Sequence, residues 1–269
     1  MQFRFALAFA LCAAPAAAET FDCVIDPSQT VEVAGSSGGV VSRVFVQPGD
    51  EVSKGQLLAT LDSTIQLATA DMLRLRASDT SEIEAQSTQL AFLEGRLERA
   101  QELSDRGVVT REGLEEIQSA VDASRAMLAR AELSRRVAME ELKRAEALLS
   151  LLEIHSPIDG IVLERHLEDG EYLPQEGRLA TIVQLDPLDV VAFLPVREFG
   201  TIEEGDTAQV RPAPPVDGEH TAEITRIDKV FDVASGTFGL HLRLDNPDLE
   251  IPAGLRCKVD FGPRSPGGG

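Results

Sequence analysis

The four histidines of the chain are the first residues to consider for metal chemistry, because neutral imidazole is a common metal ligand. They are His155, His166, His220 and His241. None of them stands four residues from another, and none has a cysteine nearby at a ligand-type spacing. We therefore expect surface or strand histidines and no metal site. The chain also lacks a nucleophile elbow, a Walker sequence and a dinucleotide-binding sequence, so nothing in it predicts an enzyme or a bound cofactor.

Two of the three cysteines, Cys23 and Cys257, lie near opposite ends of the chain. The third, Cys12, falls in a stretch that is typical of a secretory signal: Arg4 gives the positive start, and small residues at positions 16–18 fit a cleavage site. An uncleaved membrane anchor is the alternative, but the apolar run is short for a membrane span. Export to an oxidising compartment predicts one disulfide between Cys23 and Cys257, with a structural role.

The overall charge excludes one large class of partner. The formal net charge is −20, and nucleic-acid binding needs a basic surface. Aromatic residues make up only 4% of the chain, with no Trp. Leu-, Val- and Ala-rich helices and small β modules would explain that scarcity.

Residues 64–152 predict two long helices joined by a tight turn. In the second helix, apolar residues alternate at steps of three and four, which is the seam of a coiled coil. One series holds Leu114, Val121, Leu128, Arg135, Leu142 and Leu149, and the other holds Ile117, Ser124, Ala131, Ala138, Ala145 and Leu152. The first helix repeats the seam less cleanly. Its members are Ile65, Met72, Leu93 and Ala100 in one series and Ile83, Leu90 and Leu97 in the other.

The ends of these helices carry capping signals. Ser63 and Gln66 fit a capping box at the start of the first helix. Gly107 can take the left-handed conformation that ends a helix, and Thr110 can cap the next one. So short a linker makes the two arms antiparallel. An arm of about 40 residues would reach roughly 60 Å, much farther than a small domain needs to cover its own core.

The segments that flank the helices repeat one another. Gly39-Val40-Val41 returns as Gly160-Ile161-Val162, and Gly49-Asp50-Glu51-Val52 returns as Gly170-Glu171-Tyr172-Leu173. Such a repeat around a helical insertion predicts two half-motifs that pair into one small β-sandwich. From residue 186 onward, short alternating strands separated by turns predict a small β-barrel.

This arrangement resembles the periplasmic adaptor subunits, or membrane fusion proteins, of the HlyD-like family in tripartite efflux pumps. The likeness rests on Val46, Gly49, Asp50 and Gln56 in the first half-motif. The second half-motif has a similar Ser156-Pro157-x-Asp159-Gly160, and the barrel a similar Asn246-Pro247 with Pro252-x-Gly254. The resemblance implies an α+β fold: a lipoyl-like (biotinyl-like) sandwich split by an antiparallel coiled-coil hairpin and followed by a small barrel.

The expected division of the chain follows from this likeness. It comprises a signal peptide (1–18), an N-terminal strand joining the barrel (19–35), half-motif 1 (36–62), the helical hairpin (63–153), half-motif 2 (154–185), the barrel (186–261) and a disordered tail (262–269). A cofactor-carrying lipoyl domain is the rival interpretation. Its carrier lysine should follow the first half-motif, and Lys54 stands in the wrong turn for that role.

The resemblance also implies partner-binding residues at the hairpin tip. The family's Arg-x3-Leu-x6-Ser/Thr pattern is matched by Arg99, Leu103 and Thr110, with Gly107 in the turn between them. In the family these residues are implied to seat the tip on an outer-membrane channel; arginine offers several donors and leucine fills a groove. The residues alone allow a simpler interpretation, in which Arg99 is solvated, Leu103 belongs to the seam and Thr110 only caps a helix.

Further expectations come from the family as well. They are a periplasmic location, an inner-membrane transporter of the resistance-nodulation-division type as a partner, and self-association into a ring. Two departures from the family pattern concern the transporter side: little sequence follows the barrel, and the family's Arg-Thr pair is replaced around Ser235-Gly236-Thr237-Phe238. An ATP-driven or type I secretion exporter, or an envelope scaffold without a transport role, stays open as an alternative.

Overall fold

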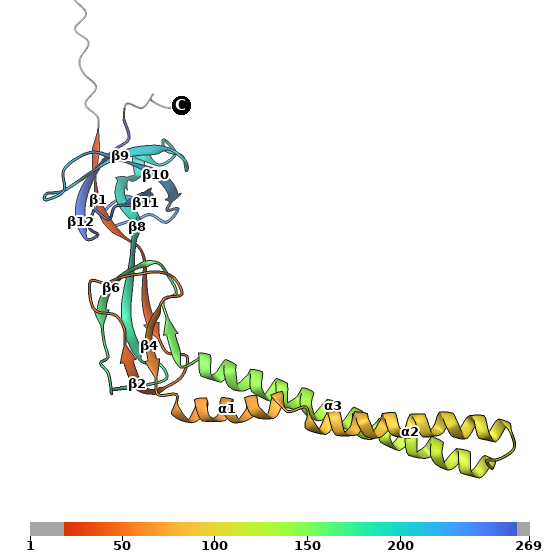
Figure 1. Cartoon of the computed structure of the whole chain (residues 1–269). Coiled ribbons are helices and arrows are strands. Elements are labelled where there is room, and N and C mark those ends of the chain that lie inside the picture. Colours follow the sequence, from red (N-terminus) through yellow and green to blue (C-terminus); the bar gives the residue numbers. More distant parts are fainter. Residues whose placement is uncertain (1–18, 263–269) are drawn as a thin grey trace, which may run out of the picture.

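The computed structural model describes residues 19–262. The predicted signal peptide and residues 263–269 of the predicted tail therefore lie outside the described residues. Three parts follow one another in space: a β-barrel, a β-sandwich and a pair of long helical arms (Figure 1). The arms leave the sandwich at the end remote from the barrel and run away from it at an angle (Figure 1).

The barrel closes through six of the described strands. They are β1 (Thr20–Ala34), β8 (Arg178–Pro195), β9 (Thr207–Pro212), β10 (His220–Ile227), β11 (Thr237–Leu244) and β12 (Leu255–Asp260). The order is β1-β12-β9-β10-β11-β8, and β8 pairs with β1 to close the ring. A short 3-10 turn, η1 (Val196–Glu198), follows β8. Alternate residues of each strand point into the barrel, as Leu240 and Leu242 do on β11.

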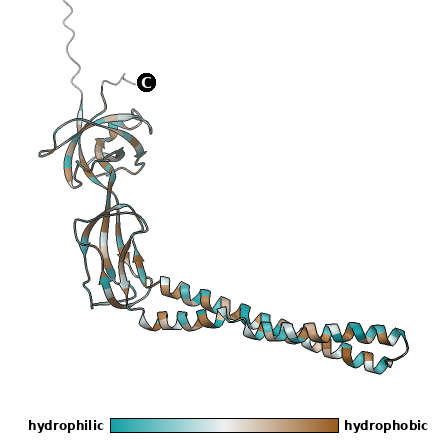
Figure 2. Ribbon diagram, viewed as in Figure 1, coloured by the Kyte–Doolittle hydropathy of each residue, from teal (hydrophilic) through white to brown (hydrophobic). Residues whose placement is uncertain are grey.

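The sandwich is built from both copies of the sequence repeat. Its shorter strands are β2 (Gly39–Val44), β3 (Glu51–Val52), β4 (Leu57–Leu61), β5 (Glu153–His155), β6 (Gly160–Arg165) and β7 (Tyr172–Leu173). Strands of the two copies pair with each other: Val40 lies opposite Tyr172, and Glu51 opposite Ile161. Hydrophobic and hydrophilic residues alternate along these strands (Figure 2). The two separated strand clusters therefore fold into one unit, as the repeat predicted.

Glycine at position 160 is required by this pairing. A Cβ atom built on Gly160 would lie 2.3 Å from the carbonyl oxygen of Val183, so a side chain would push β6 away from β8. The neighbouring carboxylate of Asp159 accepts a hydrogen bond from the backbone N–H of Lys54 at 2.8 Å. The Asp159-Gly160 pair thus joins the two half-motifs where β3 and β6 meet.

Barrel and sandwich share two long strands. β1 pairs with β12 near its start and with β8 along most of its length. The predicted boundary between residues 185 and 186 falls inside β8, and the predicted N-terminal strand continues from the barrel into the sandwich. The junction is braced by the buried Asn246, whose amide nitrogen donates to the carbonyls of Leu185 at 3.0 Å and Ile251 at 2.9 Å.

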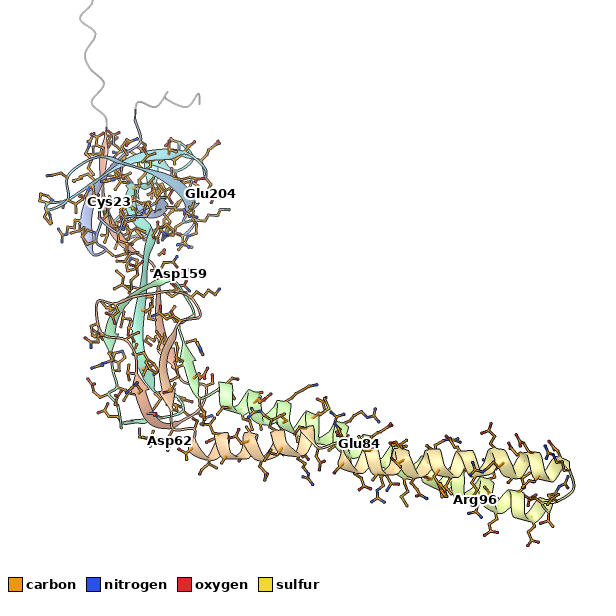
Figure 3. All side chains as sticks on the ribbon, in the orientation of Figure 1. Cys23, Asp62, Glu84, Arg96, Asp159 and Glu204 are labelled. Atoms are coloured by element: carbon orange, nitrogen blue, oxygen red, sulfur yellow. A yellow bond between two sulfur atoms is a disulfide. The ribbon has the colours of Figure 1, made fainter. Side chains whose placement is uncertain are left out.

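The predicted disulfide is present and lies in the barrel. Cys23 on β1 stands directly opposite Cys257 on β12, and their sulfur atoms are bonded. Cys23 is labelled in Figure 3. Both cysteines are buried, in keeping with the structural role that we expected.

The helical arms consist of α1 (Thr64–Ser78), α2 (Ser81–Asp105) and α3 (Arg111–Ser150). We call these three helices the helical hairpin. Both α1 and α2 pack against α3, and α2 and α3 are joined by a five-residue turn at 106–110. Salt bridges cross between the arms, from Arg74 to Glu146 at 3.0 Å and from Arg125 to Glu94 at 2.8 Å.

The seam predicted for the second arm is confirmed. None of its twelve positions is exposed, and Val121, Ser124, Ala131, Ala138 and Ala145 are buried. Small residues occupy most of the buried positions, so the arms can approach closely. Arg135, the charged member of the seam, is half-buried.

Two seam predictions for the first arm are wrong. Ile65 and Met72 are 78% and 59% exposed. The less exposed residues of α1 are instead Gln66, Ala70, Leu73 and Ala77. In α2 the predicted phase holds, because Gln86, Leu93 and Ala100 are half-buried or buried.

A break between α1 and α2 explains the error. Asp79 has an extended backbone with ψ of 119°, so the first arm is two helices and not one. The carboxylate of Asp79 accepts a hydrogen bond from the N–H of Ser81 at 2.9 Å, which satisfies a free donor at the start of α2. Across this break the seam shifts by one residue, from the series containing Gln66 and Leu73 to the series containing Gln86 and Leu93.

The predicted capping box at Ser63 is also wrong. The side chain of Ser63 makes no capping hydrogen bond. The carboxylate of Asp62 accepts bonds from the N–H of Thr64 at 3.0 Å and from its hydroxyl at 2.7 Å. These bonds, first that of the hydroxyl, lower the pKa of Asp62 from its ordinary value. The carboxylate of Asp62 is a stronger hydrogen-bond acceptor than the hydroxyl of Ser63, and it anchors the start of α1 beside the sandwich (Figure 3).

Candidate functional site: the hairpin tip

The turn at the end of the helical hairpin has a regular helix-ending geometry. Gly107 has φ of +76°, a left-handed conformation that other residues adopt only with strain. The N–H of Gly107 donates to the carbonyl of Ser104 at 2.8 Å, and that of Val108 donates to Leu103 at 2.9 Å. These bonds satisfy carbonyls that the end of α2 leaves free. We call residues 99–110 the hairpin tip.

Thr110 starts the second arm, as predicted. Its hydroxyl accepts a hydrogen bond from the N–H of Gly113 at 3.2 Å, and its backbone is extended. This is the capping role of the simpler interpretation. The side chain is exposed, so the same hydroxyl faces solvent at the tip.

Arg99 and Leu103 lie on consecutive turns of α2. Residues four apart share a face of a helix, so the two side chains lie on one side of the arm. Both are exposed, Leu103 at 40%, while Ala100 between them is buried in the seam. Leu103 is thus only partly withdrawn from solvent and is not enclosed by the opposite arm.

The guanidinium of Arg99 has no partner among the described residues, as is also true of Arg130, Arg136 and Arg144 on α3. Arg74 and Arg125, in contrast, bridge the two arms. Arg96, three residues earlier, is also exposed and lies on the same distal half of the hairpin (Figure 3). The guanidinium of Arg99 therefore keeps its hydrogen-bond donors available for a partner.

The structure brings the four predicted tip residues into one small region, with Arg99, Leu103 and Gly107 ending one arm and Thr110 beginning the other. Sequence reasoning missed Val108. This residue is 69% exposed at the turn, while Val109 beside it is half-buried. Two adjacent valines directly after the helix-ending glycine were the available signal, because a turn that only reverses the chain has no need of them.

The histidines form no metal site in the described part of the chain, where no group of three or more His, Cys, Asp or Glu side chains is placed to hold an ion. His241 stands between two acids, with Nδ1 3.1 Å from Asp189 and Nε2 3.6 Å from Asp228. Arg226 also contacts its ring, so a cation already occupies this position. His166 pairs with the hydroxyl of Thr181 at 3.0 Å.

None of the helices in residues 19–262 is long and apolar enough to span a membrane. The helical hairpin is instead amphipathic, with its apolar seam turned inward and charged residues outside. Its side chains surround the arms along their whole length (Figure 3).

Comparison with known proteins places this architecture in a family. Residues 29–184 match the model of the CzcB-like, barrel-sandwich hybrid domain. The chain is 26% identical to the pyoverdine export membrane fusion protein PvdR of Pseudomonas putida, over 88% of this chain and 67% of that protein. It is 25% identical to the multidrug resistance protein MdtA of Escherichia coli, over 83% of this chain and 53% of that protein.

Solved structures share the fold. MacA from Actinobacillus actinomycetemcomitans aligns with a TM-score of 0.74 over 91% of this chain and 78% of that chain, at 18% identity. The membrane fusion protein Spr0693 from Streptococcus pneumoniae aligns with a TM-score of 0.63 over 92% of this chain, at 15% identity. The chain spans about half to two thirds of the length of the curated relatives it matches. The family match covers more than half of the chain, which therefore belongs to the membrane fusion proteins with a CzcB-like barrel-sandwich hybrid domain.

Proposed function

We propose that this protein is a periplasmic adaptor of an efflux system, which links an inner-membrane transporter to an outer-membrane channel through its hairpin tip. The family membership supports the general adaptor role. In this proposal the sandwich is of the lipoyl-like type and carries no cofactor, and the work is mechanical. The protein would catalyse no reaction. It would span the distance between its two partners and hold them in a fixed relative position.

The observation that carries the proposal is the helical hairpin itself. α3 alone has 40 residues, which at 1.5 Å per residue extends for roughly 60 Å. Its far end presents the exposed side chains of Arg99, Leu103 and Val108. A long rod with a polar donor and two apolar side chains at its end suits docking onto the helical end of another protein.

Partner identity rests on resemblance. The curated relatives include a pyoverdine export protein and a multidrug resistance protein, which favours small molecules as cargo. A transporter of the resistance-nodulation-division type is proposed from the resemblance of the sequence to the adaptor family alone. One tip contact would be weak, so we also propose self-association into a ring, in which several tips engage one channel together. An ATP-driven or type I exporter in place of that transporter would leave the role of the tip unchanged.

The experiment that tests this proposal exchanges one charge at the tip. Arg99→Asp should abolish export in a strain that carries only this variant, because a carboxylate there repels the carbonyls and acids that the guanidinium would contact. Arg130→Asp is the matched control, since Arg130 is likewise exposed but lies in the middle of α3. Both variants should keep the wild-type circular dichroism and melting temperature.

Three results would count against the proposal. Unchanged drug or metal tolerance with Arg99→Asp would remove the tip from the mechanism. Equal loss with Arg130→Asp would point to a general effect of charge. If the wild-type protein fails to co-purify with any outer-membrane channel, an envelope scaffold without a transport role becomes the better description.

A further inference from the structure

The first helix of the hairpin has a second apolar stripe on its outer side. The members of this stripe follow one another at steps of three and four residues, like a coiled-coil seam, and all are exposed: Ile65, Ala68, Met72 and Leu75. Ile65 and Leu75 are 78% and 74% exposed. Met72 follows the buried Ala70 by two residues, or about 200° around the helix, so the stripe faces away from α3. We call these four residues the α1 stripe.

α3 carries a comparable stripe on the opposite edge of the helical hairpin. Its exposed members, again at steps of three and four, are Val137, Glu140, Arg144, Ala147 and Leu151. Glu140 follows the buried Ala138 by two residues, so this stripe faces away from α1. An open hollow of about 740 Å³ lies on the same stretch, and Val137, Met139 and Arg144 contribute to its lining. We call these five exposed residues the α3 stripe.

The two stripes lie at about the same distance from the sandwich. Next to the sandwich, α1 and α3 run side by side (Figure 1). Arg74 on α1 bonds to Glu146 on α3 at 3.0 Å, and Arg135 donates to the carbonyl of Ala77 at 3.2 Å. These bonds place the last turn of α1 beside residues 135–146 of α3. A closed ring of identical copies requires such equal heights, because a contact that climbs along the axis produces an open filament.

The charges along the two stripes alternate with opposite signs. From the sandwich toward the tip, the outer side of α1 reads negative, positive, negative: Asp71, Arg76 and then Asp79. Over the same distance the outer side of α3 reads positive, negative, positive: Arg144 and Lys143, Glu141 and Glu140, and then Arg136. The two edges are therefore complementary in charge when α1 lies antiparallel to α3 of another copy.

The flanking charges are also on the matching sides of the stripes. In an antiparallel coiled coil, each flank of one seam faces the like flank of the other. Asp71 then comes to lie opposite Lys143. The same arrangement places Arg76 opposite Glu141.

These four side chains are available for such a contact. Arg76 and Glu141 take part in no ion pair within residues 19–262. Asp71 pairs with Arg74 at 2.6 Å, and Lys143 pairs with Glu140 at 2.7 Å, each within its own helix and with exposed side chains. Exposed pairs of this kind stabilise a protein little, so exchanging them for partners on another copy costs little.

We propose that the α1 stripe of one copy packs antiparallel against the α3 stripe of the next copy. The inference deepens the proposed function, on which it rests for the existence of a ring, and it names the two surfaces that build that ring. Because the surfaces differ, each copy offers one to each neighbour, as ring closure requires. The break at Asp79 has a role in this arrangement, since it turns Ile65 and Met72 out of the inner seam and toward the neighbouring copy.

Disulfide crosslinking between two full-length copies in living cells tests the contact. One copy carries Ala68→Cys in the α1 stripe, and the other, marked with a different epitope tag, carries Ala147→Cys in the α3 stripe. Oxidation should give an adduct with both tags, several-fold above the adducts with one tag alone. Ala126→Cys is the matched control, because Ala126 is an exposed alanine of α3 that lies roughly 30 Å nearer the tip. Paired with Ala68→Cys, it should give no more adduct than the parent chain.

A charge exchange shows whether the predicted ion pairs set the contact. Arg76→Glu in the copy with Ala68→Cys should lower the two-tag adduct several-fold, because it places a carboxylate opposite Glu141. Adding Glu141→Arg to the other copy should restore the adduct. An effect of Arg76→Glu on the fold of its own chain would not be rescued by a change in a different chain.

Three outcomes would overturn the proposal. One-tag adducts above the two-tag adduct would show that like stripes pair in a two-fold dimer. Equal yields from Ala126→Cys and Ala147→Cys would show that the contact has no fixed height, and adducts formed only with other proteins would assign the stripes to a different partner. None of these outcomes bears on tip docking, which Arg99→Asp tests separately. Loss of export with Arg130→Asp as well as Arg99→Asp, with the two-tag adduct retained, would count against the proposed docking role and leave the contact between copies standing.

Discussion

The guanidinium of Arg135 donates a hydrogen bond from Nε to the backbone carbonyl of Ala77 at 3.2 Å, which joins the middle of α3 to the last turn of α1. In an uninterrupted helix the carbonyl of Ala77 would accept from the N–H of Ser81. That N–H is instead bonded to the carboxylate of Asp79. Arg135 thus satisfies a carbonyl that the break has freed, and its charge in the seam has a structural reason.

The first prediction concerns this bond. Arg135→Ala should lower the free energy of unfolding of the helical hairpin by about 1–2 kcal/mol, because a partly buried carbonyl loses its charged donor. Arg130→Ala, on the exposed side of α3, should change it by less than about 0.5 kcal/mol. Urea titration followed by helical circular dichroism measures both. Equal effects of the two variants would mean that the bond to Ala77 contributes nothing.

The second prediction is a dependence on pH at the same break. Hydrogen bonds from Ser81, first that of its side chain, hold the pKa of Asp79 below its ordinary value of 3.8. Since the folded pKa is the lower one, the stabilising contribution is complete above 3.8 and is lost as the pH falls through the folded value. Asp79→Asn should therefore make the hairpin less sensitive to acid than the wild type.

Urea titrations at neutral pH and below pH 3.8 would measure how much stability the wild type and the Asp79→Asn variant each lose in acid. Asp105→Asn, at the far end of the same arm, is the control and should leave the acid sensitivity of the break as it is. A wild type and an Asp79→Asn variant that lose stability in parallel over this range would contradict the capping role of Asp79.

The third prediction concerns the junction between barrel and sandwich. Asn246 is buried and joins Leu185 and Ile251 through its amide group, and its own N–H donates to Asp186 at 2.8 Å. Asn246→Ala would leave buried carbonyls unpaired, so we expect a loss of about 2–4 kcal/mol in the free energy of unfolding. Asp248→Ala, exposed in the same loop, should have little effect. Calorimetry of both variants is the measurement, and similar melting temperatures would refute the bracing role.

The sequence was sufficient wherever one strong pattern controls the structure. The seam of α3 was predicted position by position because a regular three-four alternation leaves one inward face. The pairing of the strand clusters followed from the repeat, and the disulfide from two cysteines in a chain with a predicted export signal. The position of Gly107 and the cap at Thr110 were also foreseen, since few residues can serve at those places.

The errors in α1 have a local physical cause. Ile65 and Met72 continue the phase of Leu93 and Ala100, so periodicity alone predicts one straight helix. The break at Asp79 depends on a short-range bond to Ser81 and on a donor from Arg135, which lies 58 residues away in the sequence. Such a long-range partner leaves no periodic signal. Val108 escaped notice for a similar reason, because exposure within a turn depends on how the two arms meet.

The most direct test of the account places a photocrosslinking amino acid at single positions of the hairpin in living cells. Introduced at Val108 or Leu103, it should give a covalent adduct with an outer-membrane channel protein. Introduced at Val137, which is exposed on α3 far from the turn, it should not. Adducts to a channel from the tip positions alone are the predicted result. No channel adduct at either tip position, or an equal yield at Val137, would contradict the claim that the tip is the docking end.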